Sequence, residues 1–394
     1  MEIYLDNGAS TQVDPKAAKA MLPFFTEKYA NISSTHSFGK RCSYAVDDAR
    51  KIIADSIGAN PEEIIFTSGG TESDNFAVKG IAFANKGRGN HIITTKIEHK
   101  AVLKSCEWLE KQGFKVTYLD VDEEGFVDPK ALEKAITKKT ILVSIIHGNN
   151  EIGTIQDLMA LGNICKKYDI YFHTDACQSY TKTLLDVKKQ PVGLMTLNSH
   201  KIHGPKGIGA LYIRKGTKIE PWQHGGGHEF GMRSGTEDVP GIVGFAEAVR
   251  LGLNGRDKHI KQMIRLRNKL IEGILENVAD ARLNGPKYDT DGSKRLCSNT
   301  NLSFKGLEAD EIGGCLDAKR IYSSAGSACS ARSHEPSYVL KAVNVPEDYI
   351  RGSLRLTLSR FTTEKEIGYV LETLPGIVEK MRKVSFIGKI IGKL

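Results

Sequence analysis

The stretch IYFHTDACQ, residues 170–178, carries the clearest structural information in this 394-residue chain. It begins with a short apolar run that predicts a strand over residues 170–174. Asp175 follows that strand directly. A carboxylate that ends an apolar strand is costly if it is buried without a cationic partner, so Asp175 indicates either a ligand site or a structural ion pair.

The same pattern continues on both sides of this stretch. From about residue 60 to residue 215, short apolar runs alternate with amphipathic segments, as expected when helices cover a mostly parallel sheet. The predicted strands are residues 63–67, 91–95, 115–119, 140–146, 170–174, 194–197 and 208–213. The sequence therefore predicts an α/β fold.

The flanking regions predict further helices and a second, smaller unit. Asp14-Pro15 is typical of a helix start, and residues 46–57 make one helical face that ends at Gly58. A charged helix over 258–276 leads to an α+β unit beginning near Arg282. The segment 363–366 has capping-box spacing for a late helix, which Pro375 should interrupt.

The length of the chain favours two domains. We place an N-terminal arm and a large domain in residues 1–257, and a small C-terminal α+β domain in residues 258–394.

Composition limits the classes of protein to which the chain can belong. No apolar run approaches the roughly 20 residues that span a bilayer, and the first residues lack the features of a secretory signal, so we expect no membrane partner and a cytoplasmic location. Seven cysteines without a Cys-x-x-Cys pair argue against a disulfide framework and a zinc site. The net charge is +8, but the sequence has no nucleic-acid recognition motif, so we expect no direct nucleic-acid partner.

Lys201, in NSHKIHGPKG at residues 198–207, indicates which kind of ligand Asp175 could bind. A lysine amine can hold an aldehyde as a Schiff base, and a carboxylate paired with a pyridine nitrogen keeps the ring an electron acceptor. Together these two residues indicate pyridoxal 5'-phosphate and an amino-acid substrate activated at Cα.

Three other positions follow predicted strands in the same way. The turn SGGTESDN, residues 68–75, opens a helix whose free N–H groups could hold a phosphate, with Thr71 adding a hydroxyl. His99 could stack on a ring and move protons, and Asn150 could bond the cofactor or a substrate carboxylate. Each is ordinary when taken alone. Their shared place at the carboxyl edge of the sheet favours a ligand site.

These motifs resemble those of the cysteine desulfurases, pyridoxal-phosphate enzymes of the aspartate-aminotransferase-like fold, fold type I. The resemblance spans nearly the whole chain. It also rests on YLD (4–6), NISSTH (31–36), GGGHE (225–229), RSGT (233–236), GSAC (326–329), EPSYVL (335–340) and LRL (354–356). So many matches in the same order are highly specific.

The resemblance implies a role for each matching position. Lys201 would bind the cofactor aldehyde, Asp175 the ring nitrogen and Gln178 the phenolic oxygen, while His99 would stack on the ring. Arg355 would clamp the substrate carboxylate, with Asn31 and Asn150 assisting. The implied cofactor-binding positions are Gly70, Thr71, Asn150, Asp175, Gln178, Asn198, His200, Lys201 and Thr236. Because Thr236 would reach the phosphate of the other subunit, the family also implies a homodimer.

Cys329 separates this family from ordinary aminotransferases. The resemblance implies that its thiolate takes sulfur from L-cysteine, giving L-alanine and a persulfide on Cys329. Small polar residues surround it, as suits a loop that carries sulfur outward. The loop length resembles the housekeeping and nitrogen-fixation branch, so an iron–sulfur scaffold protein is the favoured acceptor, and transfer-RNA thiolation stays open.

Some positions depart from the family pattern and leave other interpretations open. Ile32 replaces a proline, and Asn198 stands where a phosphate-binding serine is common. The alternatives are a selenocysteine lyase, another lyase or aminotransferase with the same cofactor, and a non-catalytic scaffold that keeps the fold. His224 and His228 flank three glycines without a helix to orient them, so we expect no metal site.

Overall fold

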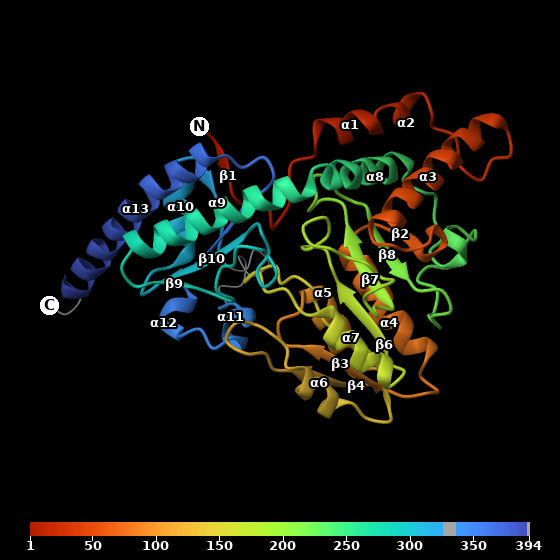
Figure 1. Cartoon of the computed structure of the whole chain (residues 1–394), viewed down its shortest axis with the longest axis horizontal. Helices are drawn as coiled ribbons and strands as arrows, with labels where there is room; N and C mark the ends of the chain where they lie inside the picture. Colours follow the sequence, from red (N-terminus) through yellow and green to blue (C-terminus); the bar gives the residue numbers. More distant parts are fainter. Residues whose placement is uncertain (326–335, 392–394) are drawn as a thin grey trace.

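The computed structural model describes residues 1–325 and 336–391, with side chains described as far as residue 383. Figure 1 shows an elongated molecule with two halves, and its described residues form three sheets. The larger sheet has seven strands in the order β2-β8-β7-β6-β5-β3-β4. They are β2 (Ile64–Thr67), β3 (His91–Thr95), β4 (Lys115–Leu119), β5 (Thr140–Ser144), β6 (Tyr171–Asp175), β7 (Leu194–Asn198) and β8 (Gly209–Ile213).

The larger sheet is mostly parallel, as predicted. β8 runs antiparallel to both of its neighbours, and every pair from β7 across to β4 is parallel. All seven predicted strands are present, and their observed bounds lie within one or two residues of the predicted ones. The predicted α/β fold is confirmed.

Helices cover both faces of this sheet. The helices of the first part of the chain are α1 (Pro15–Met21), α2 (Pro23–Thr26), α3 (Ser37–Ser56), α4 (Gly70–Ala84), α5 (Lys100–Glu110), α6 (Pro129–Ala135), α7 (Leu158–Lys167) and α8 (Val239–Leu253). Ile64 and Phe66 pack in a buried cluster with α3, α7 and α8, whereas Ile65 between them packs with α4 and α5. Successive side chains of a strand point to opposite faces, so β2 contributes to both layers.

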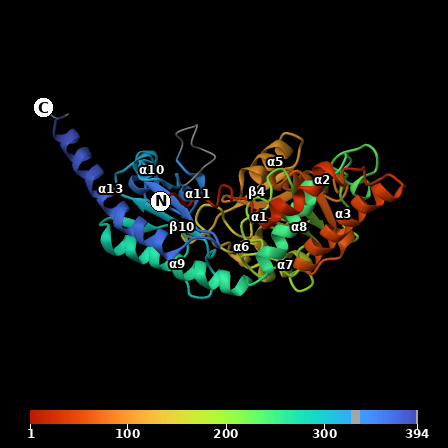
Figure 2. The same cartoon turned by 90° about the horizontal axis from the view of Figure 1, so that it is seen from above.

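The second half of the molecule is built on a four-stranded antiparallel sheet of order β12-β13-β10-β9. Its elements are β9 (Ala281–Leu283), β10 (Asn299–Phe304), β11 (Ile321–Tyr322), β12 (Ser324–Ala325), β13 (Ser353–Thr357), α9 (Arg256–Asn277), α10 (Ala309–Asp317), α11 (Tyr338–Ala342), α12 (Glu347–Ile350) and α13 (Glu364–Ile391). Figure 2 shows α9 and α13 along one side of this half. The predicted α+β character of the C-terminal region is observed.

The N-terminal arm joins the second half, far from its neighbours in sequence. β1 (Ile3–Tyr4) pairs in parallel with β11, and Ile3 and Leu5 are buried in the same cluster as Leu302 and Leu354. The predicted domain boundary at 257/258 falls in the first turn of α9 and stays a prediction.

The last helix departs from the sequence-based expectation. Thr363 and Glu366 form the predicted capping box, with Thr363 N donating to Glu366 Oε2 at 2.6 Å. The predicted interruption at Pro375 is wrong, because α13 continues through it to Ile391. Val370, Leu374 and Val378 on either side of the proline are fully buried. Burial of this face offsets the backbone hydrogen bond that a proline removes.

Among the helices that the structure describes, none combines the length and the apolar character that crossing a bilayer requires.

Candidate active site

A cavity of about 250 Å³ lies beside the carboxyl ends of the parallel strands. Its lining includes ten of the predicted site residues, namely Gly70, Thr71, His99, Asn150, Asp175, Gln178, Asn198, His200, Lys201 and Arg355. Asp175 ends β6 and Asn198 ends β7, while His99 follows β3. The predicted convergence at this edge of the sheet is therefore observed.

Lys201 is held by the N-terminal arm. Its Nζ donates to the carbonyl oxygen of Gly8 at 2.6 Å, and Gln178 Nε2 donates to the same oxygen at 2.8 Å. Burial lowers the pKa of Lys201 to about 8, with the nearby Arg355 charge adding to the effect. The neutral, nucleophilic amine is thus far more abundant near neutral pH than for an exposed lysine.

Asp175 is buried beside a second carboxyl group. Its Oδ1 accepts from the Cys177 backbone N–H at 2.8 Å. One polar side-chain atom of Asp74, one of His99 and one of Asp175 all lie within 4.8 Å of one another. Burial raises the pKa of Asp74 well above its usual value, and the Asp175 charge adds to this rise. Asp74 is therefore the carboxyl group of this pair that burial favours in the protonated form.

His99 is oriented by the helix that it begins. It is the N-cap of α5, and its Nδ1 accepts from the Ala101 backbone N–H at 3.2 Å. Nδ1 is therefore unprotonated, and the proton of the neutral ring lies on Nε2. Burial lowers the pKa of His99, so the neutral form dominates at physiological pH.

The glycine-rich turn forms one end of the cavity. Gly69 is the N-cap of α4 and has no side chain that could cap the helix. The N–H groups of the first turn are therefore left for a ligand. A Cβ added to Gly70 would lie 2.7 Å from Cys177 Sγ, so only glycine fits between the turn and this strand end. Thr71 and His200 line this region as well as the neighbouring hollow that contains Lys206.

Arg355 faces Lys201 from the second half of the molecule. It lies in the middle of β13, is 2% exposed, and its Nη1 donates to the Asn150 carbonyl at 3.0 Å. Its Nη2 donates to Asp6 Oδ1 at 3.1 Å, and its buried Nε has no partner. The guanidinium is thus fixed in place with donor capacity remaining for an anion.

Sequence analysis missed several groups of this site. Glu151 is buried in the lining and accepts from Ser337 Oγ at 2.5 Å. Burial raises the pKa of Glu151 to about 7. Tyr338 Oη donates to the Glu98 carbonyl at 2.6 Å. Glu151 directly follows the predicted Asn150, and Ser337 and Tyr338 lie in the EPSYVL motif, so their position in the sequence was the available signal.

Three predicted residues stand apart from this cavity. Asn31 is exposed and its Oδ1 accepts from the Ser33 backbone N–H at 2.8 Å. Thr236 is also exposed, and neither residue lines the cavity. Cys329 lies outside the described residues. The roles assigned to all three stay predictions.

Unpaired polar atoms in the cavity fit a polar, ring-shaped ligand such as pyridoxal phosphate. Buried atoms without a hydrogen-bond partner include Asp74 Oδ1, Asn150 Oδ1, Asn198 Oδ1 and Arg355 Nε. A buried polar atom without a partner is costly, so their concentration in one cavity indicates a ligand that supplies the missing bonds. The donor set also matches, with an amine, a carboxylate, an imidazole and a helix N-terminus around one space.

Comparisons with known proteins agree with this geometry. The sequence profile described as aminotransferase class V matches residues 3–370. "Cysteine desulfurase IscS" of Dictyoglomus turgidum is 50% identical over 98% of this chain and 96% of its own length. The protein of the same name from Methanosarcina thermophila is 50% identical over 97% of this chain and 93% of its own length.

Solved structures give the same result. A structure titled "NifS-like protein" has a TM-score of 0.89 and 37% identity, and the match covers 96% of this chain and all of that one. A structure titled "SspA in complex with cysteine" has a TM-score of 0.79 and 37% identity over 92% of this chain and all of that one. The chain therefore belongs to the class V aminotransferase family and, within it, to the cysteine desulfurases.

Proposed function

We propose that this protein binds pyridoxal phosphate and removes sulfur from L-cysteine, giving L-alanine and a persulfide on Cys329. The observation that carries the proposal is the convergence of Lys201, Asp175 and His99 in one cavity, with Arg355 opposite them. An amine, a carboxylate and an imidazole at the edge of a sheet suit this cofactor, and an arginine suits the carboxylate of an amino acid.

Each residue of the active-site cavity has its own role in the proposed reaction. When bound, pyridoxal phosphate supplies an electron-accepting ring that activates the amino acid. Lys201 would hold the cofactor through its amine, and Asp175 would pair with the ring nitrogen. The Nε2–H of His99, whose Nδ1 accepts from Ala101, would be the donor that this imidazole offers within the cavity.

Substrate recognition falls to the side of the cavity that Arg355 occupies. The guanidinium holds the substrate carboxylate through its remaining donors, and Asn150 supplies an amide beside it. Because Arg355 is already fixed by Asp6 and the Asn150 carbonyl, little side-chain entropy is lost when the substrate binds.

The sulfur step conserves atoms and electrons. The thiolate of Cys329 attacks the substrate sulfur, so an S–S bond forms as the substrate C–S bond breaks. The electron pair of that bond stays on the β-carbon, which takes up a proton to give L-alanine. Cys329 is left as the persulfide, and no external oxidant is needed.

The partners follow from the same assignment. Thr236 is exposed and lies apart from the cavity of its own chain, which suits a contact with the cofactor phosphate of a second copy in a homodimer. We assign an iron–sulfur scaffold protein as the main sulfur acceptor and the cytoplasm as the compartment.

Replacing the sulfur-accepting cysteine tests the proposed function. Cys329→Ser should keep the visible absorbance of the bound cofactor while alanine and sulfide production fall by more than about 10³-fold, as expected when a nucleophile is lost. Cys315→Ser is the matched control, because Cys315 is an exposed cysteine outside the cavity and its loss should change neither measurement.

The possible results separate the competing functions. Undiminished turnover of cysteine by Cys329→Ser would defeat the proposed mechanism. Turnover of selenocysteine but not cysteine by the unmodified protein would identify a selenocysteine lyase. Purified protein with neither cofactor absorbance nor cysteine-dependent alanine release would identify a non-catalytic scaffold.

A further inference from the structure

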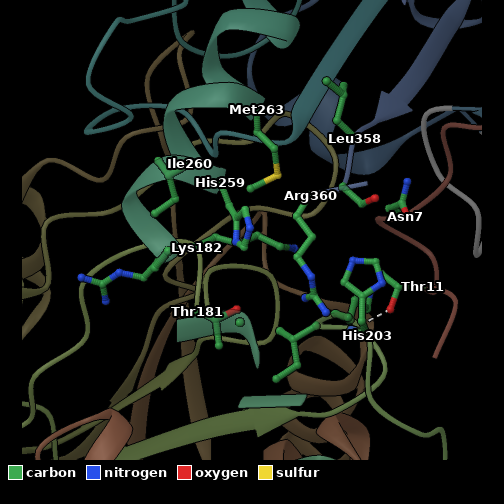
Figure 3. A pocket seen from close by; sticks show the side chains of 15 residues that line it. Asn7, Thr11, Thr181, Lys182, His203, His259, Ile260, Met263, Leu358 and Arg360 are labelled. Carbon is green, nitrogen blue, oxygen red and sulfur yellow. Dashed lines mark hydrogen bonds between the residues drawn. The ribbon is translucent and has the colours of Figure 1, made fainter. Parts of the chain in front are cut away.

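A second cavity lies behind Lys201, on the side away from the proposed cofactor. Its lining comes from the N-terminal arm, the segment after β6, the segment after β7, the start of α9 and residues 358–360 after β13. Among the residues that the structure describes, Lys201 alone lines both this cavity and the active-site cavity. Figure 3 shows the second cavity, with His203, His259 and Arg360 around one hollow.

The charged groups of this second cavity are all basic. In the described part of the chain, five basic side chains line it besides Lys201, namely Lys182, His203, Arg256, His259 and Arg360, and no aspartate or glutamate does. Two of these groups have acidic partners nearby. Arg360 Nη2 bonds to Asp14 Oδ2 at 2.6 Å, and Arg256 Nε lies 3.6 Å from Asp257 Oδ1.

Lys182 has no such partner. Its Nζ makes no hydrogen bond or ion pair with any residue in the described part of the chain. Burial lowers its pKa, and no carboxylate contributes to holding its charge. Lys182 is partly buried, and an anion in this cavity would supply the counter-charge that its ammonium lacks.

His259 adds a second unused group. Its Nδ1 is buried without a hydrogen-bond partner, whereas His203 Nδ1 is bonded to the Gln12 carbonyl at 2.9 Å. A neutral imidazole protonated on Nδ1 would donate one hydrogen bond from that atom to a ligand. Lys182 and His259 therefore line the same space with an ammonium and an imidazole nitrogen that has no partner within the described residues.

We propose that the cavity lined by Lys182 and His259 is a binding site for one small anion, a halide or a single carboxylate group. The space within it is about 30 Å³, and roughly 10–15 Å³ suffices for one water, so a small anion fits and a large one does not. An anion there would supply the counter-charge that Lys182 lacks and accept the bond that His259 Nδ1 leaves unmade.

An occupant of this site would act on the active-site lysine. The Lys182 charge is one of the causes that lower the pKa of Lys201, after burial and Arg355. An anion beside Lys182 would offset that charge and raise the pKa of Lys201. The second cavity is thus electrostatically coupled to the active site through Lys201.

Bromide is a direct probe, since its anomalous scattering locates it in a crystal. In crystals of the holoenzyme soaked in sodium bromide, we expect an anomalous peak within hydrogen-bonding reach of Lys182 Nζ. The peak should disappear in Lys182→Met, which keeps a long side chain but removes the charge. It should persist in Lys138→Met, the matched control, because Lys138 is exposed and distant from both cavities.

A solution measurement does not depend on crystals. At constant ionic strength, replacing sodium gluconate by sodium bromide or sodium formate should raise the thermal midpoint of the holoenzyme by about 1–2 °C, because gluconate is too large to enter. The rise should be absent in Lys182→Met and Lys182→Gln. A crystal without a peak in this cavity, a peak that survives Lys182→Met, or equal midpoints in the three salts would each overturn the proposal.

Discussion

The two cavities that share Lys201 differ in how their charges are balanced. The active-site cavity contains the carboxyl groups of Asp74, Asp175 and Glu151 as well as the basic groups of Lys201 and Arg355. The cavity behind it, the rear cavity, has basic groups and no carboxylate among the described residues that line it. Acidic and basic groups thus meet where a ligand with groups of both signs would bind, whereas basic groups predominate where we propose a simple anion. The following substitutions test this contrast.

The largest effect should come from the lysine common to both cavities. Lys201→Ala removes the amine that holds the cofactor, so we expect the visible absorbance of the cofactor to vanish and alanine production to fall by more than about 10³-fold. The comparison variant is Lys182→Met, which removes a neighbouring charge but leaves the Lys201 amine in place, so the cofactor absorbance should remain. Absorbance spectra and an alanine assay on both proteins make the comparison, and an intact cofactor band in Lys201→Ala would contradict the assignment.

The two neighbouring aspartates should differ strongly. Asp175→Asn removes the negative charge that keeps the ring nitrogen protonated, and we expect kcat to fall by roughly 10²-fold or more. Asp74 is already protonated because burial raises its pKa, and asparagine resembles a protonated carboxyl group. Asp74→Asn should change kcat less than about 5-fold. Equal losses in the two variants would show that both carboxyl groups act as anions.

The two arginines on either side of Lys201 provide a smaller contrast. Arg355→Lys replaces a fixed fork of donors with a single ammonium, so KM for L-cysteine should rise about 10-fold to 100-fold. Arg360→Lys keeps a cation beside Asp14 in the rear cavity and should leave KM within about 3-fold. Steady-state kinetics at saturating cofactor measures KM for the two variants. A similar KM in both would show that Arg355 does not bind the substrate.

Acid should lower the free energy of unfolding through two buried histidines near the active-site cavity. Of the four effects predicted in this section, this one should be the smallest. Burial lowers the pKa of His147 and of His173 to about 4. The unfolded chain therefore binds more protons than the native one below about pH 6.5, so stability is complete above that pH and is lost as pH falls toward 4.

Each of these two histidines should cost about 1 kcal/mol of unfolding free energy at pH 5.5. Urea unfolding of the wild type and of His147→Asn at pH 7.5 and pH 5.5 measures this loss. The variant should lose less stability than the wild type between the two pH values. Identical losses would show that His147 is not a neutral histidine in the folded protein.

The sequence predicted the strands better than the details of the site. Short runs of β-branched and aromatic residues between turn residues placed β3 and β4 to the residue, because such side chains favour the extended, pleated backbone. It also identified ten of the residues that line the active-site cavity, since parallel strands end at a common edge.

Other features could not be predicted because their cause lies in tertiary structure. The Gly8 carbonyl that holds Lys201 and Gln178 is a backbone group, and any residue type would supply it. The continuation of α13 through Pro375 depends on buried neighbours in another part of the chain. The rear cavity joins segments that are distant in sequence, so no local pattern marks Lys182 or His259.

Bonds between the N-terminal arm and β13 bear on the order in which the active-site cavity is assembled during synthesis. Asn7 Nδ2 donates to the Thr357 carbonyl at 2.8 Å, and the Gly8 backbone N–H donates to Thr357 Oγ1 at 2.7 Å. Residues 7 and 8 leave the ribosome long before β13, so the segment that presents the Gly8 carbonyl to Lys201 gains these bonds only after β13 has been made. A nascent chain that already has its seven-stranded sheet still lacks Arg355 and a fixed Lys201. The active-site cavity is therefore completed only once β13 has formed.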